Sequence, residues 1–217
     1  LRTPLTTVRA YADLLASDES VAPNIRSRAR ERISHESRRM SRLIDDLLLL
    51  ARLASTSLGS TSRVDIGSLM SSHFSDLRVL DPGRSVELHC DACFVDGDPS
   101  LLERVFANLA SNVHRHTPES SRVIASCKTQ NDAVQCVIED AGPGLDDRQM
   151  RQLAAGTERF GYLGSGDRHG TGLGLFLVAS IIRSHGGTAS FTRGDLGGLR
   201  VSLTLPRHHP APRAGDQ

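Results

Sequence analysis

The sequence predicts an α+β protein in which a two-helix hairpin precedes an α/β sandwich with a mixed, mainly antiparallel sheet. Apolar residues recur at helical spacing through residues 1–54, and the small polar run over residues 55–62 has the composition of a linker. Beyond it, strand and helix patterns come in runs without regular βαβ alternation, which favours a mixed or antiparallel sheet. The length of 217 residues is sufficient for two modest domains.

The hairpin is predicted from two amphipathic stretches that a polar break separates. The first stretch places apolar residues at steps of three and four, at Leu5, Val8, Ala12 and Leu15. The second carries a heptad-like seam through Ile33, Ser37, Met40, Ile44, Leu47 and Ala51. Two helices are too few to bury both stripes, so we expect a homodimer whose hairpins form a four-helix bundle. The alternative is a hairpin that packs on its own second domain.

Residues 63–206 are predicted to form the sandwich domain. Helices are expected at about residues 69–80, 99–116 and 173–185, and strands at 64–66, 86–90, 94–95, 122–128, 133–139, 188–193 and 199–205. Asp98 and Pro99 are a start signal for the middle helix. The glycine- and charge-rich stretch 156–170 is predicted to be a mobile loop, and residues 207–217 a flexible tail.

The composition excludes several classes of protein. The 26 basic and 25 acidic residues give a net charge of +1, which does not suit a protein that binds nucleic acid. The apolar stretches are too short to span a membrane, so we expect no membrane segment in this chain. The one lysine, Lys128, has no upstream glycines and no kinase-like context, which excludes a P-loop and a protein-kinase site. The four cysteines lack paired zinc spacing, and we interpret them as reduced, mostly buried residues.

A first chemical motif lies on the predicted helix 99–116. Asn108 and Asn112 are four residues apart and therefore share one helix face. An asparagine carbonyl is a hard neutral oxygen that suits Mg²⁺, and Arg115 can neutralise phosphate charge. Alone the motif is weak, because asparagines on a polar helix face are usually only solvated.

Two glycine-rich motifs follow. Asp140 ends an apolar strand and precedes Gly142 and Gly144, so its carboxylate can accept a hydrogen bond from an exocyclic amine while the glycines let the backbone approach a flat base. Residues 170–175, Gly-Thr-Gly-Leu-Gly-Leu, open an apolar helix whose free N–H groups can bind an anion. Each motif alone also fits an ordinary turn or helix start.

In this order the three motifs resemble the ATPase domain of the histidine kinases, which belongs to a superfamily shared with gyrase, Hsp90 and the mismatch-repair ATPases. Residues 108–117 resemble the family's N box, residues 140–144 its G1 box and residues 170–175 its G2 box. Glu158-Arg159-Phe160 resembles the F box. The resemblance covers roughly residues 1–206.

The resemblance implies a role for each motif residue. Asn112 would hold Mg²⁺ with support from Asn108, and Asp140 would recognise the adenine of ATP. The remaining nucleotide-binding residues would be Arg115, His116, Gly142, Gly144, Arg159, Gly170, Thr171, Gly172, Leu173 and Gly174. Residues 156–170 would form the lid over the nucleotide.

The first residues identify the subfamily. Leu1-Arg2-Thr3-Pro4-Leu5-Thr6 resembles the end of the histidine-kinase H box, which implies a dimerising phosphotransfer hairpin. The acceptor histidine would lie two positions before Leu1, outside this chain, and autophosphorylation of this fragment is therefore doubtful. Thr3 would lie one helical turn after that histidine, where relatives use a threonine in dephosphorylating the response regulator. Ser34-His35-Glu36 imitates an H box, but no Thr-Pro follows it.

The resulting hypothesis is the cytoplasmic core of a sensor histidine kinase, as in the cytoplasmic part of an inner-membrane sensor. It would bind Mg-ATP, transfer the γ-phosphate to a histidine and relay it to an aspartate of a response regulator. One alternative is a stand-alone ATP-binding subunit that phosphorylates a separate histidine-bearing kinase chain. The other is a catalytically inactive module that only dimerises.

Overall fold

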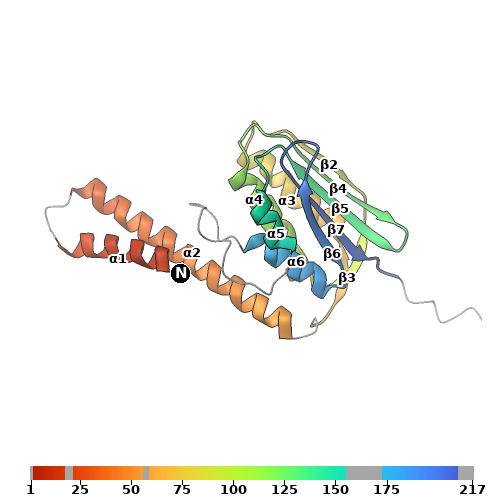
Figure 1. Ribbon diagram of the computed structural model, residues 1–217, viewed down its shortest axis with the longest axis horizontal. Helices are drawn as coiled ribbons and strands as arrows, with labels where there is room; N and C mark the ends of the chain where they lie inside the picture. Colours follow the sequence, from red (N-terminus) through yellow and green to blue (C-terminus); the bar gives the residue numbers. More distant parts are fainter. Residues whose placement is uncertain (1, 18–21, 56–58, 155–172, 210–217) are drawn as a thin grey trace, which may run out of the picture. The chain divides into compact units, whose positions relative to one another are not determined.

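The computed structural model describes residues 2–17, 22–55, 59–154 and 173–209, and the chain forms two compact units, Leu1–Arg52 and Leu53–Gln217 (Figure 1). The first unit holds the helices α1 (Arg2–Ser17) and α2 (Pro23–Ser55). Pro23 lies at the first position of α2, where its missing N–H costs no helical hydrogen bond. No helix in the described ranges is both long and apolar enough to cross a bilayer.

The two helices of the hairpin keep large apolar side chains at the surface. Leu5 is 57% exposed, Ile44 46% and Leu48 55%. Transferring such side chains out of water is favourable, so this surface favours association. The exposed side chains Ile44 and Leu47 belong to the heptad-like seam that the sequence shows.

The second unit is built on a five-stranded sheet in the order β2-β4-β5-β7-β6. Its strands are β2 (Val86–Cys90), β4 (Val123–Gln130), β5 (Ala133–Asp140), β7 (Leu199–Pro206) and β6 (Thr188–Arg193). Only the β2–β4 pair is parallel; the other three pairs are antiparallel. The predicted mixed, mainly antiparallel sheet is therefore confirmed.

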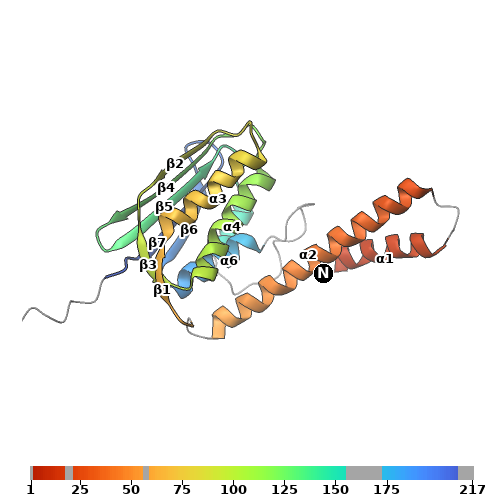
Figure 2. The ribbon, with the colours of Figure 1, turned by 180° about the vertical axis from the view of Figure 1, so that it is seen from behind.

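Three helices pack against one face of this sheet: α3 (Ile66–Leu80), α4 (Pro99–His116) and α6 (Gly174–Ser184) (Figure 2). Burial alternates along the strands, with Val201, Leu203 and Leu205 buried while the residues between them are half-exposed. The helices contribute large side chains to the same core, among them Phe74, Phe106 and Leu177. A separate two-stranded ribbon pairs β1 (Ser62–Asp65) with β3 (Phe94–Gly97).

Two local features differ from the sequence prediction. Ile66 begins α3 instead of ending a strand, because the Asp65 carboxylate accepts hydrogen bonds from the Gly67 and Ser68 amides and caps the helix. The helix α5 (Asp147–Ala154) was not predicted. It starts at a reciprocal cap in which Asp146 and Gln149 each accept from the other's amide, at 2.9 and 2.7 Å.

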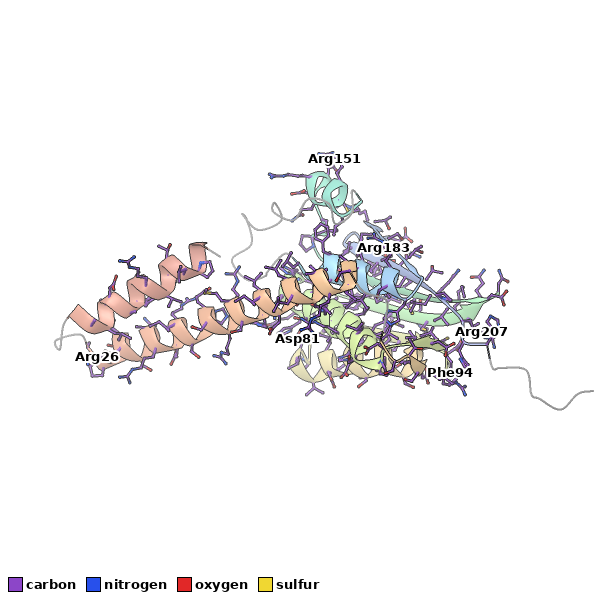
Figure 3. The ribbon with its side chains drawn as sticks, turned by 90° about the horizontal axis from the view of Figure 1, so that it is seen from below. Arg26, Asp81, Phe94, Arg151, Arg183 and Arg207 are labelled. Atoms are coloured by element: carbon purple, nitrogen blue, oxygen red, sulfur yellow. The ribbon has the colours of Figure 1, made fainter. Side chains whose placement is uncertain are left out.

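The described part of the predicted tail is attached to the domain. The Arg207 amide donates to the Asp132 carbonyl at 3.0 Å, and the His208 amide donates to the Phe94 carbonyl at 2.8 Å. Figure 3 accordingly labels Phe94 and Arg207 at the same end of the domain. Residues 207 and 208 of the expected flexible tail are therefore held against the domain, and residues 210–217 lie outside the described residues.

The four cysteines are free, and three of them are buried. The thiols of Cys127 and Cys136 face each other across β4 and β5 with their sulfur atoms 3.4 Å apart. Burial raises the pKa of the Cys93 thiol to about 11. A thiol so protonated is a poor nucleophile, which fits the interpretation of Cys93 as a small core side chain.

Candidate nucleotide-binding site

The helix α4 is held firmly at both ends, and this fixes the two asparagines that it carries. The Asp98 carboxylate caps its start by accepting from the Ser100 and Leu101 amides at 2.9 and 3.2 Å. At its end the Thr117 amide donates to the Val113 carbonyl at 3.1 Å. One face of α4 is buried through Leu102, Val105, Phe106, Leu109, Ala110 and Val113. Asn108 and Asn112 lie off that face and are half-exposed.

The two asparagines differ in what they contact. The Nδ2 atom of Asn108 donates to the Arg104 carbonyl at 2.8 Å. Its Oδ1 atom lies 3.4 Å from the position that a Cβ on Gly174 would occupy, so Asn108 reaches the start of α6. Asn112 forms no side-chain hydrogen bond with another residue of the described ranges. Its carboxamide therefore remains available to a ligand.

Asp140 ends β5 and lies almost wholly inside the domain, with 4% of its surface exposed. Its Oδ1 atom accepts from the amides of Gly142 at 2.8 Å and Leu199 at 3.3 Å. Burial raises the pKa of this carboxyl, although the two amides and the positive charge of Arg84 oppose the rise. Among the described residues both hydrogen bonds to this carboxylate converge on Oδ1, so the second oxygen remains available as an acceptor.

Glycine backbone surrounds this carboxylate. A Cβ on Gly198 would stand 2.3 Å from both the carbonyl oxygen and Oδ1 of Asp140, a distance that real structures do not tolerate. A Cβ on Gly142 would stand 2.8 Å from Oδ1 and 2.6 Å from Cγ2 of Thr117. Gly144 adopts a φ of 71°, a left-handed conformation that favours glycine. Gly142 and Gly198 thus let the backbone approach the Asp140 carboxylate more closely than any other residue would permit.

The helix α6 begins without a side-chain cap. Its N-cap residue, Leu173, forms no side-chain capping hydrogen bond, and the first helical residue is Gly174. The first amides of an α-helix have no carbonyl partner within the helix and lie at the positive end of the helix dipole, so a helix start of this kind can bind an anion. Asn108 and this helix start lie together, one on each of two packed helices.

The structure places the remaining predicted site residues as follows. Arg115 is exposed and His116 is half-buried in the last turn of α4. Thr3 lies within α1, but its side chain is outside the described residues. Arg159, Gly170, Thr171 and Gly172, together with the predicted lid, also lie outside the described residues.

Two residues that the sequence analysis did not single out lie at this site. Gly198, the last residue of the β6–β7 connection, and Leu199, the first residue of β7, approach Asp140 from about 60 positions later in the chain. The Gly197-Gly198 pair between two strands signals a tight turn, and that signal does not name the carboxylate beside it.

These groups together define a class of site. A buried carboxylate beside bare backbone can accept from an exocyclic amine, a carboxamide can supply a hard oxygen, and a helix start without a side-chain cap can bind phosphate. This donor and acceptor set on an α/β sandwich is that of a nucleotide-binding domain.

Comparison with known families gives the particular assignment. Residues 97–209 match the model of the histidine kinase-, DNA gyrase B- and HSP90-like ATPases, and the chain belongs to this family. Residues 1–56 match the His Kinase A (phospho-acceptor) domain. The ATPase match lies within the second structural unit, and the phospho-acceptor match covers the first.

Individual relatives agree with this assignment. The sensor histidine kinase TrcS of Mycobacterium tuberculosis is 31% identical over 204 residues, covering 90% of this chain and 40% of the relative. The ATP-binding domain of PrrB from Mycobacterium tuberculosis is 29% identical with a TM-score of 0.54, covering 70% of this chain and all of that domain. The Acinetobacter baumannii histidine kinase AdeS shares the fold, with a TM-score of 0.70 at 19% identity, covering 96% of this chain and 97% of AdeS. The chain spans less than half the length of the curated relatives it matches.

Proposed function

We propose that this chain is the dimerisation and ATP-binding core of a sensor histidine kinase. It binds Mg-ATP, transfers the γ-phosphate to a histidine and passes the phosphoryl group on to an aspartate of a response regulator. The observation that carries the proposal is the buried Asp140 carboxylate, which lies against glycine backbone and has one oxygen engaged by two amides. The family matches to both units, residues 1–56 and 97–209, support it.

The arrangement at Asp140 favours adenine over guanine. With Oδ1 engaged by Gly142 and Leu199, Oδ2 accepts a hydrogen bond from the exocyclic amine of adenine. Guanine presents a carbonyl oxygen at the corresponding position, and two acceptors facing each other in a buried site repel. The proposed substrate is therefore ATP rather than GTP.

The residues of α4 fit the metal and phosphate end of the nucleotide. The Asn112 carboxamide has no partner among the described residues, and its neutral oxygen is a ligand that Mg²⁺ accepts together with water and phosphate oxygens. Bound there, Mg²⁺ would neutralise phosphate charge. Arg115, one turn further on, adds positive charge on the same helix, and His116 follows it. The α6 start beside Asn108 contributes the first backbone amides of that helix. Gly170, Thr171, Gly172 and Arg159 complete the proposed phosphate and lid residues.

Phosphoryl transfer in such a site depends on position and charge more than on acid–base chemistry. The residues of α4 and α6 hold the phosphates, and water exclusion around Asp140 fixes the base, so the γ-phosphate can be presented in line to an imidazole nitrogen. We expect the hairpin units of two chains to associate through the exposed apolar side chains of α1 and α2. Thr3 is the proposed phosphatase-type residue, and the response regulator is the proposed second partner.

The decisive experiment is a calorimetric titration of the folded chain with ATP, with Mg²⁺ and with EDTA. Wild-type protein should bind ATP more tightly with Mg²⁺ present, and Asn112→Ala should lose most of that difference. The neighbouring change Ser111→Ala on the same helix is the matched control and should behave as wild type. Heat of binding with GTP equal to that with ATP, or an Asn112→Ala variant with full Mg²⁺ dependence, contradicts the proposal.

A further inference from the structure

Arg84 is a buried cation outside the motifs that define the nucleotide site. Its side chain has no exposed surface, and it follows α3 in the short connection to β2. A charge removed from water in this way is tolerated only when hydrogen-bond partners surround it. The hydrogen-bond partners of Arg84 therefore indicate its structural role.

The guanidinium group joins two segments of the domain. On one side its Nε atom donates to Oδ2 of Asp81 at 2.9 Å, and Nη2 forms an ion pair with the same oxygen at 2.9 Å. On the other side Nη1 donates to the hydroxyls of Thr117 and of Ser121, the latter at 2.9 Å. Figure 3 labels Asp81 at the end of α3. Arg84 thus connects the end of α3 to the loop between α4 and β4.

This connection fixes the loop that follows the asparagine helix. The Thr117 hydroxyl donates in turn to the Val113 carbonyl at 2.8 Å, and the Ser121 hydroxyl donates to the Pro118 carbonyl at 2.5 Å. Each hydroxyl therefore accepts from Arg84 and donates to backbone. The loop between α4 and β4 cannot shift without breaking hydrogen bonds to a buried charge, which is costly.

Thr117 carries this restraint to the nucleotide site. Its Cγ2 atom lies 2.6 Å from the position that a Cβ on Gly142 would occupy, so the threonine packs directly on the glycine backbone. The Gly142 amide in turn donates to Oδ1 of Asp140. A continuous path of contacts therefore runs from Arg84 through Thr117 and Gly142 to Asp140.

A second, electrostatic route connects the same two ends. Burial raises the pKa of the Asp140 carboxyl, and the charge of Arg84 is one of the groups that oppose the rise, while the nearby carboxylate of Glu139 adds to it. Glu139 is itself paired with Arg200 at 2.9 Å. The charge of Arg84 is shared with Asp81, whose Oδ2 atom also accepts from His114 at 2.9 Å. These are the charged groups that surround the path.

We propose that Arg84 is a positioning residue for the adenine base: without touching the nucleotide, it holds Thr117 and Gly142 where they orient the Asp140 carboxylate. Its charge also favours the ionised form of that carboxylate, which is the form that accepts from the adenine amine. The inference rests on the proposed function, because it concerns the same site.

The test compares ATP affinity, over the pH range in which the proteins stay folded, for variants that separate the two routes. Arg84→Met removes both the hydrogen bonds and the charge, and ATP binding should weaken by about 2- to 30-fold, the range typical of residues that act on a site through others. The loss should grow as the pH falls, because Asp140 then protonates at higher pH than in wild type. Arg84→Lys keeps the charge, so it should restore the pH profile but not the full affinity.

A second variant isolates the packing route. Thr117→Ser keeps the hydroxyl that accepts from Arg84 and removes the methyl that packs on Gly142, so it should weaken ATP binding without changing the pH profile. The matched control is Arg122→Met, which removes an exposed arginine that pairs with Glu87 at 2.7 Å on the same domain. It should bind ATP as wild type does. Circular dichroism verifies that every variant is folded.

The outcomes are distinct. If wild type binds ATP while folded Arg84→Met and Thr117→Ser bind it with unchanged affinity and pH profile, Arg84 has no positioning role. If wild type binds no ATP, the proposed function fails and this inference fails with it. Should Arg84→Met not fold, the double variant Asp81→Asn, Arg84→Met removes the carboxylate that would be left buried without its partner. Its ATP affinity and pH profile then test the same prediction.

Discussion

Replacing Gly198 with alanine perturbs the Asp140 carboxylate without altering its chemistry. The added Cβ would stand 2.3 Å from the carbonyl oxygen and from Oδ1 of Asp140, and 2.6 Å from the Gly142 amide nitrogen. Two of these three atoms are backbone, so no side-chain rotation relieves the clash. The β5 and β7 strands must separate locally, and the carboxylate must move with them.

The size of the effect follows from this overlap. Forcing an extra methyl group into a well-packed site typically costs about 1–3 kcal/mol. A folded variant relaxes by displacing Asp140, and nucleotide binding must then restore the original geometry at that cost. ATP affinity should therefore fall by about 5- to 150-fold. Because the overlap lies at the base-binding end, the Mg²⁺ dependence of the remaining binding should persist.

Isothermal titration calorimetry with ATP and Mg²⁺ measures this loss directly, and urea unfolding reports how much stability the variant retains. Gly59→Ala is the matched control, because a Cβ there has nothing within 4 Å. A folded Gly198→Ala variant that binds ATP within twofold of wild type would refute the reasoning, since it would mean that the carboxylate position does not govern binding.

Three further outcomes are expected. Asp140→Asn should lose ATP binding but keep its thermal stability. Burial raises the pKa of this carboxyl, which means that its negative charge destabilises the unliganded fold and that removing the charge costs no stability. Differential scanning fluorimetry with and without ATP measures both effects. His185→Ala should lower the free energy of unfolding by about 1–3 kcal/mol, which urea unfolding measures. In the wild type the buried ring accepts a hydrogen bond from the Asp98 amide at 3.1 Å, and the variant leaves that amide unsatisfied. The hydrogen bond from His114 holds the pKa of Asp81 below its ordinary value, so the ionised carboxylate stabilises the fold above about pH 4 and this contribution is lost as the pH falls further. Acid unfolding of Asp81→Asn and of wild type tests this contribution. The same dependence of stability on pH in both proteins would contradict it.

Local signals predicted much of the fold. The Asp98-Pro99 start signal predicts α4 at the residues where the structure has it, because capping depends on a few adjacent atoms. The same logic applied to Asp146 and Gln149 would have found α5, whose capping pair is three residues apart. Such local signals do not predict strand order, because β2 pairs in parallel with β4 and the whole of α4 lies between them in the chain.

The parts of the site that sequence reasoning missed depend on contacts between distant residues. Gly198 lies 58 positions after Asp140, and Arg84 lies 33 positions before Thr117. An arginine in a Pro-Gly turn and a glycine pair between strands have ordinary local explanations. Only the folded arrangement places Gly198 beside the carboxylate and connects Arg84 to it through Thr117, and so no local pattern assigns these residues to the nucleotide site.

The central claim is that Asp140 recognises the exocyclic amine of adenine. Titration with ATP and with N6,N6-dimethyl-ATP, in the presence of Mg²⁺, tests it most directly, because dimethylation removes the donor and leaves the phosphates unchanged. The dimethylated nucleotide should bind about 10- to 150-fold more weakly than ATP, the cost of an unmade hydrogen bond to a buried charged group. Equal affinity for the two nucleotides would contradict the account.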